Sequence, residues 1–311
     1  MVPGVPTRRI LVVVKTYPNP SQSYVETVCC AGVDLDSRSW VRMYPITFRR
    51  LADKKFAKYQ VITCAVGRPR GDNRPESLRV DQDTIELVGE PMPAGDHGWR
   101  RRMSSLPLPA RSLEEIQEAQ RRDGTSLGMF RPKEIKRLVK RKAKPWSERQ
   151  RAALLQQRLS LGEAELAELA DLEQIPWSFA YEFTCDDDRC GGHELGILDW
   201  EIGESYRQWS REYGDRWEEV LRAKYEVELP GRDLHFVVGN LAKRRRTFEI
   251  IGLVRPPRPK MVDSGFVQES LDLMGEQRSV TGAGVGLEAE QADPLGLDER
   301  HEALELFPGE A

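Results

Sequence analysis

The sequence of 311 residues lacks any apolar run of the roughly 20 residues that a helix needs to cross a bilayer. The apolar stretch nearest the N-terminus, residues 10–14, is also too short for the apolar region of a signal peptide. We therefore expect a cytoplasmic protein with no membrane partner. The composition, 39% apolar and 31% charged, is that of an ordinary globular chain long enough for two domains.

Cysteine is scarce, with five residues: Cys29, Cys30, Cys64, Cys185 and Cys190. An odd number in a reducing compartment argues against a disulfide framework. Metal binding, burial or reactivity remain as their roles. No paired Cys-x-x-Cys motif is present.

The sharpest motif is Cys185-Asp-Asp-Asp-Arg-Cys190-Gly-Gly-His193. Zinc prefers sulfur and nitrogen donors in a tetrahedron, and these three side chains can fill three of its corners. The fourth ligand is open: Asp199, a cysteine of the N-terminal half, or one of the aspartates 186–188. Water in that corner would make the site catalytic. The alternative without metal is two buried thiols and a hydrogen-bonded loop histidine.

Carboxylates crowd the same region, among them Glu194, Asp199 and Glu201. Carboxylates with a histidine are typical of metal-dependent nucleases and hydrolases, so an enzyme centred on His193, Asp199 and Glu201 is an alternative function. The lysine expected beside such a group is not near it in sequence. The simpler interpretation is that Asp199 caps a helix beginning at Trp200.

Charge is divided unevenly along the chain. From Val262 onward 12 Asp/Glu face 2 Lys/Arg, which leaves 45 Lys/Arg against 38 Asp/Glu in the rest. The body is therefore mildly basic and the tail acidic. That division favours a DNA or RNA partner for the body, and it makes the tail a candidate docking segment for a protein partner.

Three basic segments can contact phosphates, and two of them have a tryptophan beside them that can stack on bases. A solvated charged surface is the alternative. The candidate nucleic-acid-binding residues in these segments are Arg100, Arg101, Arg102, Lys136, Arg137, Lys140, Arg141, Lys142, Lys144, Lys243, Arg244, Arg245 and Arg246.

The pattern of elements predicts an α+β fold. Short strands over 10–14, 25–33, 40–46 and 59–66 predict a β-barrel-like domain over 1–90. Residues 91–176 are expected to form a linker and then a basic helical connector, with helices capped at Ser112 and Ser147. Residues 177–259 are expected to form an α+β domain that carries the Cys/His site. Residues 260–311 are expected to be a disordered acidic tail.

The strand at 40–46 alternates, which places Trp40, Arg42 and Tyr44 on one face. These side chains can stack on bases, or the aromatics can be core with the arginine at its rim. Cys30-Ala-Gly-Val33 followed by Ser39-Trp-Val-Arg42 resembles the opening of prokaryotic dual oligonucleotide-binding-barrel domains, although Ser39 and Met43 stand where those domains have Gly and Pro.

That resemblance, over residues 25–46, implies an oligonucleotide-binding barrel that senses or binds nucleic acid in defence systems. Residues 185–201 resemble a motif of bacterial proteins, and this second resemblance implies no particular activity. The sequence as a whole predicts a zinc-containing nucleic-acid-binding protein of a prokaryotic defence or DNA-processing system. A metal-dependent enzyme and a protein-interaction scaffold are the alternatives.

Overall fold

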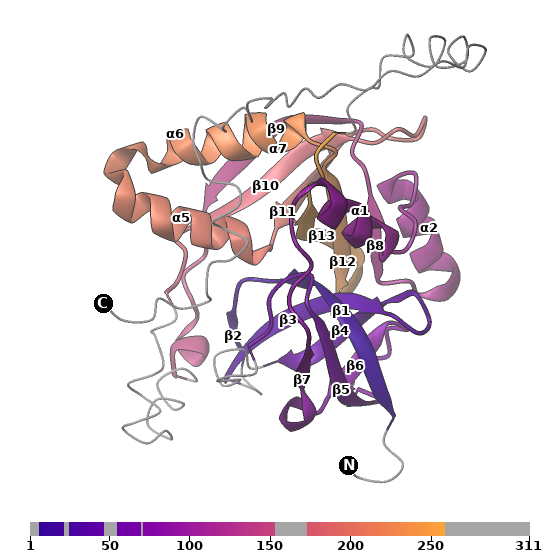
Figure 1. Ribbon diagram of the computed structural model, residues 1–311. Helices are drawn as coiled ribbons and strands as arrows, with labels where there is room; N and C mark the ends of the chain where they lie inside the picture. The colour runs from indigo at the N-terminus through magenta and orange to yellow at the C-terminus, as the bar shows by residue number, and fades with distance from the viewer. Residues whose placement is uncertain (1–5, 22–24, 47–54, 70, 153–172, 259–311) are drawn as a thin grey trace, which may run out of the picture. The chain divides into compact units, whose positions relative to one another are not determined.

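The N-terminal part of the chain is a closed barrel of five strands (Figure 1). The computed structural model describes residues 6–21, 25–46, 55–69, 71–152 and 173–258. In order around the barrel the strands are β1 (Thr7–Lys15), β3 (Val25–Asp34), β4 (Ser39–Ile46), β6 (Ser77–Val80) and β5 (Val61–Gly67), and β5 pairs again with β1. Short strands β2 (Asn19–Ser21) and β7 (Glu86–Val88) pair with β3 and β5.

Local chemistry explains these elements. The apolar run 10–14 is buried throughout, as the sequence predicts. The hairpin expected between β3 and β4 is present, and the Asp34 carboxylate accepts hydrogen bonds from the backbone N–H groups of Asp36 and Ser37 within it. β6 was missed in the sequence because it is only four residues long and follows a polar loop.

The second sheet has six strands in the order β8-β12-β13-β11-β10-β9. The α+β fold class expected from the sequence is confirmed. The strands are β8 (Leu127–Phe130), β9 (Glu134–Lys142), β10 (Trp177–Thr184), β11 (His193–Ile197), β12 (His235–Leu241) and β13 (Arg244–Val254). All neighbours are antiparallel except β11 and β13, which are parallel.

Helices complete the fold. Among the described residues they include α1 (Asp96–Ser104), α2 (Leu113–Asp123), α5 (Trp200–Glu212), α6 (Trp217–Arg222), a π-helical segment (Ala223–Glu228) and α7 (Leu229–Gly231), with short 3-10 turns at Gln82–Thr84 and Gly214–Arg216. The C-terminal helices pack on one face of the second sheet (Figure 1). There the Tyr181 hydroxyl of β10 donates to the backbone carbonyl of Tyr225, 2.6 Å away. No helix among the described residues combines the length and apolar character needed to cross a membrane.

One apolar cluster joins the barrel to the second sheet. Leu11, Val13 and Val33 of the barrel pack in it with Val237 and Ile251 of the sheet. β1 is therefore buried on both faces, which explains why its apolar residues are consecutive rather than alternating. The two sheets share a core instead of being joined by a connector.

Two sequence expectations between the barrel and β10 are wrong. The stretch 91–109 predicted as linker contains α1, whose Trp99 is buried in the shared core. The basic segment predicted as helical contains strand β9. Its Ile135, Leu138 and Val139 have helical spacing, but pairing along the whole of β10 outweighs that local preference.

The two predicted helix caps between the barrel and β10 are present. The Ser112 hydroxyl accepts from Glu115 N at 3.2 Å, but the Glu115 carboxylate returns to Arg111 N instead of Ser112 N, so this capping box is only partly formed. The box at Ser147 is complete, because Ser147 and Gln150 each accept from the backbone N–H of the other.

Asp199 is a structural residue at the junction of barrel and sheet. Its side chain is fully buried, and it caps α5 by accepting from Glu201 N at 3.1 Å, as the simpler sequence interpretation predicts. Its other oxygen accepts from Leu253 N at 2.7 Å and lies 3.4 Å from the Lys58 ammonium. Burial raises the pKa of Asp199, and the Lys58 charge opposes that shift.

Replacing Asp199 with alanine should lower the free energy of unfolding by about 3 kcal/mol, because the buried Leu253 N–H is left without an acceptor and the Lys58 ammonium loses one of its two carboxylate partners. Urea unfolding measures this decrease. Asp186→Ala is the control, since Asp186 is 74% exposed in a surface pair with Lys133, and a change within about 0.5 kcal/mol is expected there. Equal small decreases in both variants would contradict the structural role.

Candidate metal centre and basic surface

Three of the predicted metal ligands lie together at one hairpin. Phe183 of β10 pairs with His193 of β11. The loop between these two residues therefore places Cys185 and Cys190 close to the histidine. Gly192 in this loop has a φ of +94°, a conformation that a residue with a Cβ rarely adopts. The local spacing alone therefore brings the two thiols and the imidazole together.

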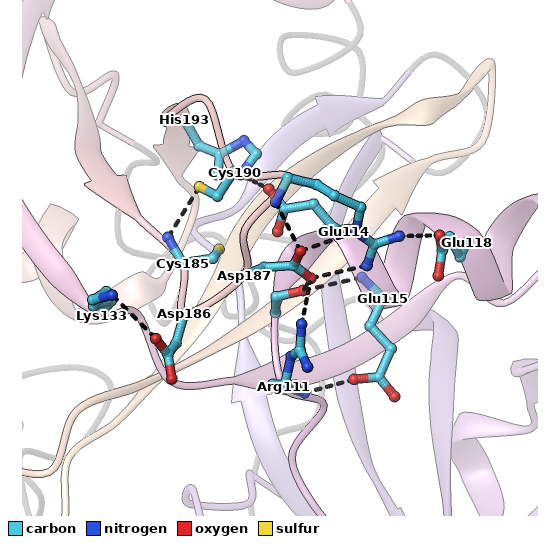
Figure 2. Close-up of polar contacts among 12 residues, drawn as sticks. Arg111, Glu114, Glu115, Glu118, Lys133, Cys185, Asp186, Asp187, Cys190 and His193 are labelled. Carbon is cyan, nitrogen blue, oxygen red and sulfur yellow. Dashed lines mark hydrogen bonds and ion pairs between the residues drawn. The ribbon is translucent and has the colours of Figure 1, made fainter.

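The fourth member is Glu114, in the first turn of α2 (Figure 2). Sequence reasoning missed it. Glu114 has no ligand-like spacing to the cysteines, and an acidic residue in a first helical turn is explained equally well by the helix dipole. Ser112, which caps α2, holds the helix against the hairpin by donating to Asp187 at 2.8 Å. The candidate ligand atoms of Glu114, Cys185, Cys190 and His193 all lie within 4.8 Å of one another.

The contacts within this cluster suit a cation. His193 Nε2 lies 2.7 Å from Glu114 Oε1, while Glu114 Oε2 is buried and has no hydrogen-bond partner among the described residues. Burial raises the pKa of the Cys185 thiol, and the nearby Glu114 and Cys190 add to that shift. Three groups that can carry negative charge are thus crowded in a partly buried place, and a bound metal ion would offset their repulsion.

The aspartates of the loop have other partners. Asp187 binds Arg189 through side-chain and backbone hydrogen bonds, which hold its pKa well below the usual range, and it also lies 3.5 Å from Arg111. Asp186 pairs with Lys133, 3.2 Å away. Figure 2 shows these pairs around the cluster. Asp186 and Asp187 therefore stabilise the loop and are not among the candidate metal ligands.

The structure does not bring Asp199 or Glu201 to this cluster. Among the described residues the only group of metal-binding side chains is the one with Glu114. Lys58 supplies the lysine that the sequence did not place near Asp199 and Glu201, 2.6 Å from Glu201, but Asp199 is closed off by backbone hydrogen bonds. His193 belongs to the cluster, so an enzyme centred on His193, Asp199 and Glu201 gains no support.

The cysteines of the barrel are also separate. Cys30 and Cys64 are buried in β3 and β5, and burial raises the pKa of Cys64 to about 11. Cys29 Sγ accepts a hydrogen bond from Arg42 at 3.3 Å. None of the three is a member of the cluster.

The aromatic strand β4 faces the core more than solvent. Arg42 is 3% exposed and donates to the backbone carbonyl of Ser126 at 3.1 Å, which ties the barrel to the segment that leads into β8. Trp40 packs against the shared apolar cluster and Tyr44 is half-buried. Arg42 is neither a base-binding residue on an open face nor a rim residue but a buried link between the sheets.

Helix α1 divides its three arginines. Arg100 and Arg101 are exposed. Arg102 is buried, with its guanidinium 4.0 Å from the centre of the Tyr59 ring and 4.7 Å from that of Trp99. Arg102 is therefore a core residue held by cation–π contacts.

Strand β9 is a basic edge strand. Arg137 pairs with Glu182 at 2.7 Å. Lys140 pairs with Glu218 and makes cation–π contacts with the rings of Trp177 and Trp217. Cations on an edge discourage pairing with a further strand. The exposed cations of this edge that form no ion pair within the described residues are Lys136, Lys142 and Lys144.

The third basic segment lies at the β12–β13 hairpin. The turn of this hairpin is short, so Arg244, Arg245 and Arg246 belong to β13. Arg74 of the barrel donates to the Asn240 carbonyl at 2.7 Å and steadies this hairpin. Arg245 faces Asp72, 4.0 Å away, and Lys243, Arg244 and Arg246 are exposed.

Two of these basic segments meet at one cavity of about 450 Å³. Arg141 of β9 and Arg246 of β13 both line it. His193 of the metal cluster lines it too, together with Glu194, whose carboxylate binds the Arg141 guanidinium at 2.7 Å. Distant basic segments and the metal cluster therefore border the same space.

Two family matches divide the chain. The family described as Domain of unknown function (DUF8757) matches residues 109–273. The family described as Domain of unknown function (DUF8758) matches residues 6–107. A search of the curated proteins found no match.

Solved structures resemble the chain only distantly. The crystal structure of the tetrameric p202 HIN2 is 9% identical, with a TM-score of 0.27, over 65% of this chain and 76% of that one. The structure of a murine DNA-binding protein bound with double-stranded DNA is also 9% identical, with a TM-score of 0.28, over 82% and 98%. TM-scores this low support no statement about function.

Removing the Glu114 carboxylate should weaken metal binding at least about tenfold, since even residues behind the ligands cost that much. The measurement is a competition titration of Glu114→Ala with Zn²⁺ against a chelator. Glu115→Ala is the matched control, because the neighbouring Glu115 accepts from Arg111 N in an exposed contact and is not a member of the cluster. Equal affinities in the two variants, or no uptake by the unaltered protein, would rule out the cluster as a metal site.

Proposed function

The chain belongs to the family described as Domain of unknown function (DUF8757), and we propose that it binds nucleic acid through the surface around the cavity between Arg141 and Arg246. The convergence of β9 and β13 on that cavity carries the proposal. Arginine forks match phosphate geometry, and the exposed cations Lys142, Arg244 and Lys243 extend the positive charge on both sides.

The metal that we propose for the cluster is zinc. Two thiols, an imidazole and a carboxylate are donors that zinc accepts in a tetrahedral site. Because four protein groups are present, no corner is left for water, which favours a structural ion over a catalytic one. Zinc there would fasten α2 to the β10–β11 hairpin, and so hold one wall of the cavity.

The barrel is the second part of this proposal. Residues 25–46 resemble prokaryotic dual oligonucleotide-binding-barrel domains, and they form β3 and β4 of a closed five-stranded barrel. We include a role in a prokaryotic defence or DNA-processing system on that resemblance. The acidic segment from Val262, a candidate docking segment for a protein partner, lies outside the described residues.

The double variant Arg141→Ala, Arg246→Ala should bind DNA and RNA about tenfold more weakly or worse, because each arginine gives charge-assisted hydrogen bonds to phosphate. The slope of log affinity against log salt concentration should become shallower by about 2, since two phosphates are no longer neutralised and release fewer counterions. Fluorescence anisotropy over a salt series measures both quantities.

The matched control is Arg211→Ala, Arg216→Ala. It removes the same charge from α5 and the following turn, where both arginines are exposed and neither lines the cavity. An equally large decrease in the affinity of the control would show a general charge effect. Absence of salt-sensitive binding by the unaltered protein would refute the nucleic-acid function.

A further inference from the structure

The cavity lies beside the point where two parallel strands pair. Within the described residues β11 and β13 pair at a single position, Ile197 with Ile250. Toward their N-terminal ends the segments 193–196 and 246–249 both line the cavity. Its volume of about 450 Å³ is in the range of small-ligand sites and can admit one nucleotide.

Two small residues line part of the cavity. Ala180 of β10 pairs directly with Gly196 of β11, and both line the space. A Cβ on Gly196 would come within 2.6 Å of the Glu249 carboxylate oxygen Oε2. Because residue 196 has no side chain, the Glu249 carboxylate can lie against the backbone of β11 there.

The charges inside the cavity differ from those on its rim. Glu194 is paired with Arg141. Glu249, half-buried in β13, accepts from the Gly196 N–H and lies near the Arg244 charge, but it forms no ion pair within the described residues. A carboxylate repels a phosphate, so Glu249 does not suit the backbone of a nucleic acid. It is an acceptor, and it suits the N–H donors on the edge of a base.

We propose that this cavity holds one unstacked base of a single strand, with Arg141 and Arg246 on the flanking phosphates and Glu249 accepting from the exocyclic amine of the base. The inference rests on the proposed nucleic-acid function and adds its substrate class. A base paired in a duplex is stacked and cannot enter a cavity in the protein. Thymine has no exocyclic amine, so cytosine is preferred to it.

The experiment compares fluorescent dodecamers of dC, of dT and of a mixed-sequence duplex, bound to the full chain in the same buffer. The unaltered protein should bind the dC strand about tenfold more tightly than the dT strand, and should bind the duplex more weakly than the dC strand. Glu249→Gln should abolish the preference for dC, because the new amide also donates to the thymine carbonyl.

Glu182→Gln is the control, since it removes one carboxylate from β10 that pairs with Arg137 and does not line the cavity. It should keep the preference. Gly196→Ala is a second test of the same carboxylate, because its Cβ displaces Glu249, and it should also reduce the preference.

The outcomes separate the two proposals. If dC, dT and duplex bind alike while the Arg141 and Arg246 variant still weakens them all, the single-base inference is overturned and the nucleic-acid function stands. If Glu249→Gln keeps the dC preference, the inference is overturned as well. If no oligonucleotide binds in a salt-sensitive way, both proposals fail.

Discussion

The buried surface shared by the barrel and the second sheet is the interaction on which the other features depend. β1 contributes one face to the interior of the barrel and the other to the cluster with Val237 and Ile251. Burial of apolar area supplies the attraction, but it has no direction. Direction comes from buried polar groups that cross the junction, above all Arg42 to the Ser126 carbonyl and Lys58 to Asp199. Burying such groups costs free energy unless they are paired. The arrangement of the two sheets that pairs them is therefore favoured over others.

That arrangement also places the proposed binding surface. Arg74 of the barrel reaches the Asn240 carbonyl and steadies the β12–β13 hairpin, from which Arg246 extends to the cavity. On the other side, the contact of Ser112 with Asp187 sets α2 against the β10–β11 hairpin. Glu114 thereby meets the two cysteines and the histidine. The cavity lies between these two supports, so its walls are held by contacts that do not themselves touch a ligand.

The cations of this chain illustrate why charge counts alone do not locate a binding surface. Of the basic residues singled out in the sequence, Arg102 is buried against Tyr59 and Trp99, and Lys140 contacts the rings of Trp177 and Trp217. Arg42 is likewise internal. These side chains stabilise the fold through cation–π contacts and hydrogen bonds. The exposed cations that remain are fewer than the sequence predicts, and Arg141 and Arg246 among them line the same cavity.

The sequence by itself determined what depends on neighbours along the chain. Apolar runs predicted the strands β1, β3, β4 and β5, a cap at Ser112 predicted α2, and the spacing of Cys185, Cys190 and His193 predicted three members of the metal cluster. Tertiary structure decided everything that needs contacts between distant segments. Glu114 became the fourth member because α2 lies against the hairpin, and Lys58 met Asp199 across the junction. The helical spacing in β9 gave way to pairing along the whole of β10. Local patterns constrain φ, ψ and periodicity, whereas partners across the fold depend on which surfaces are buried together, and no local pattern encodes that choice.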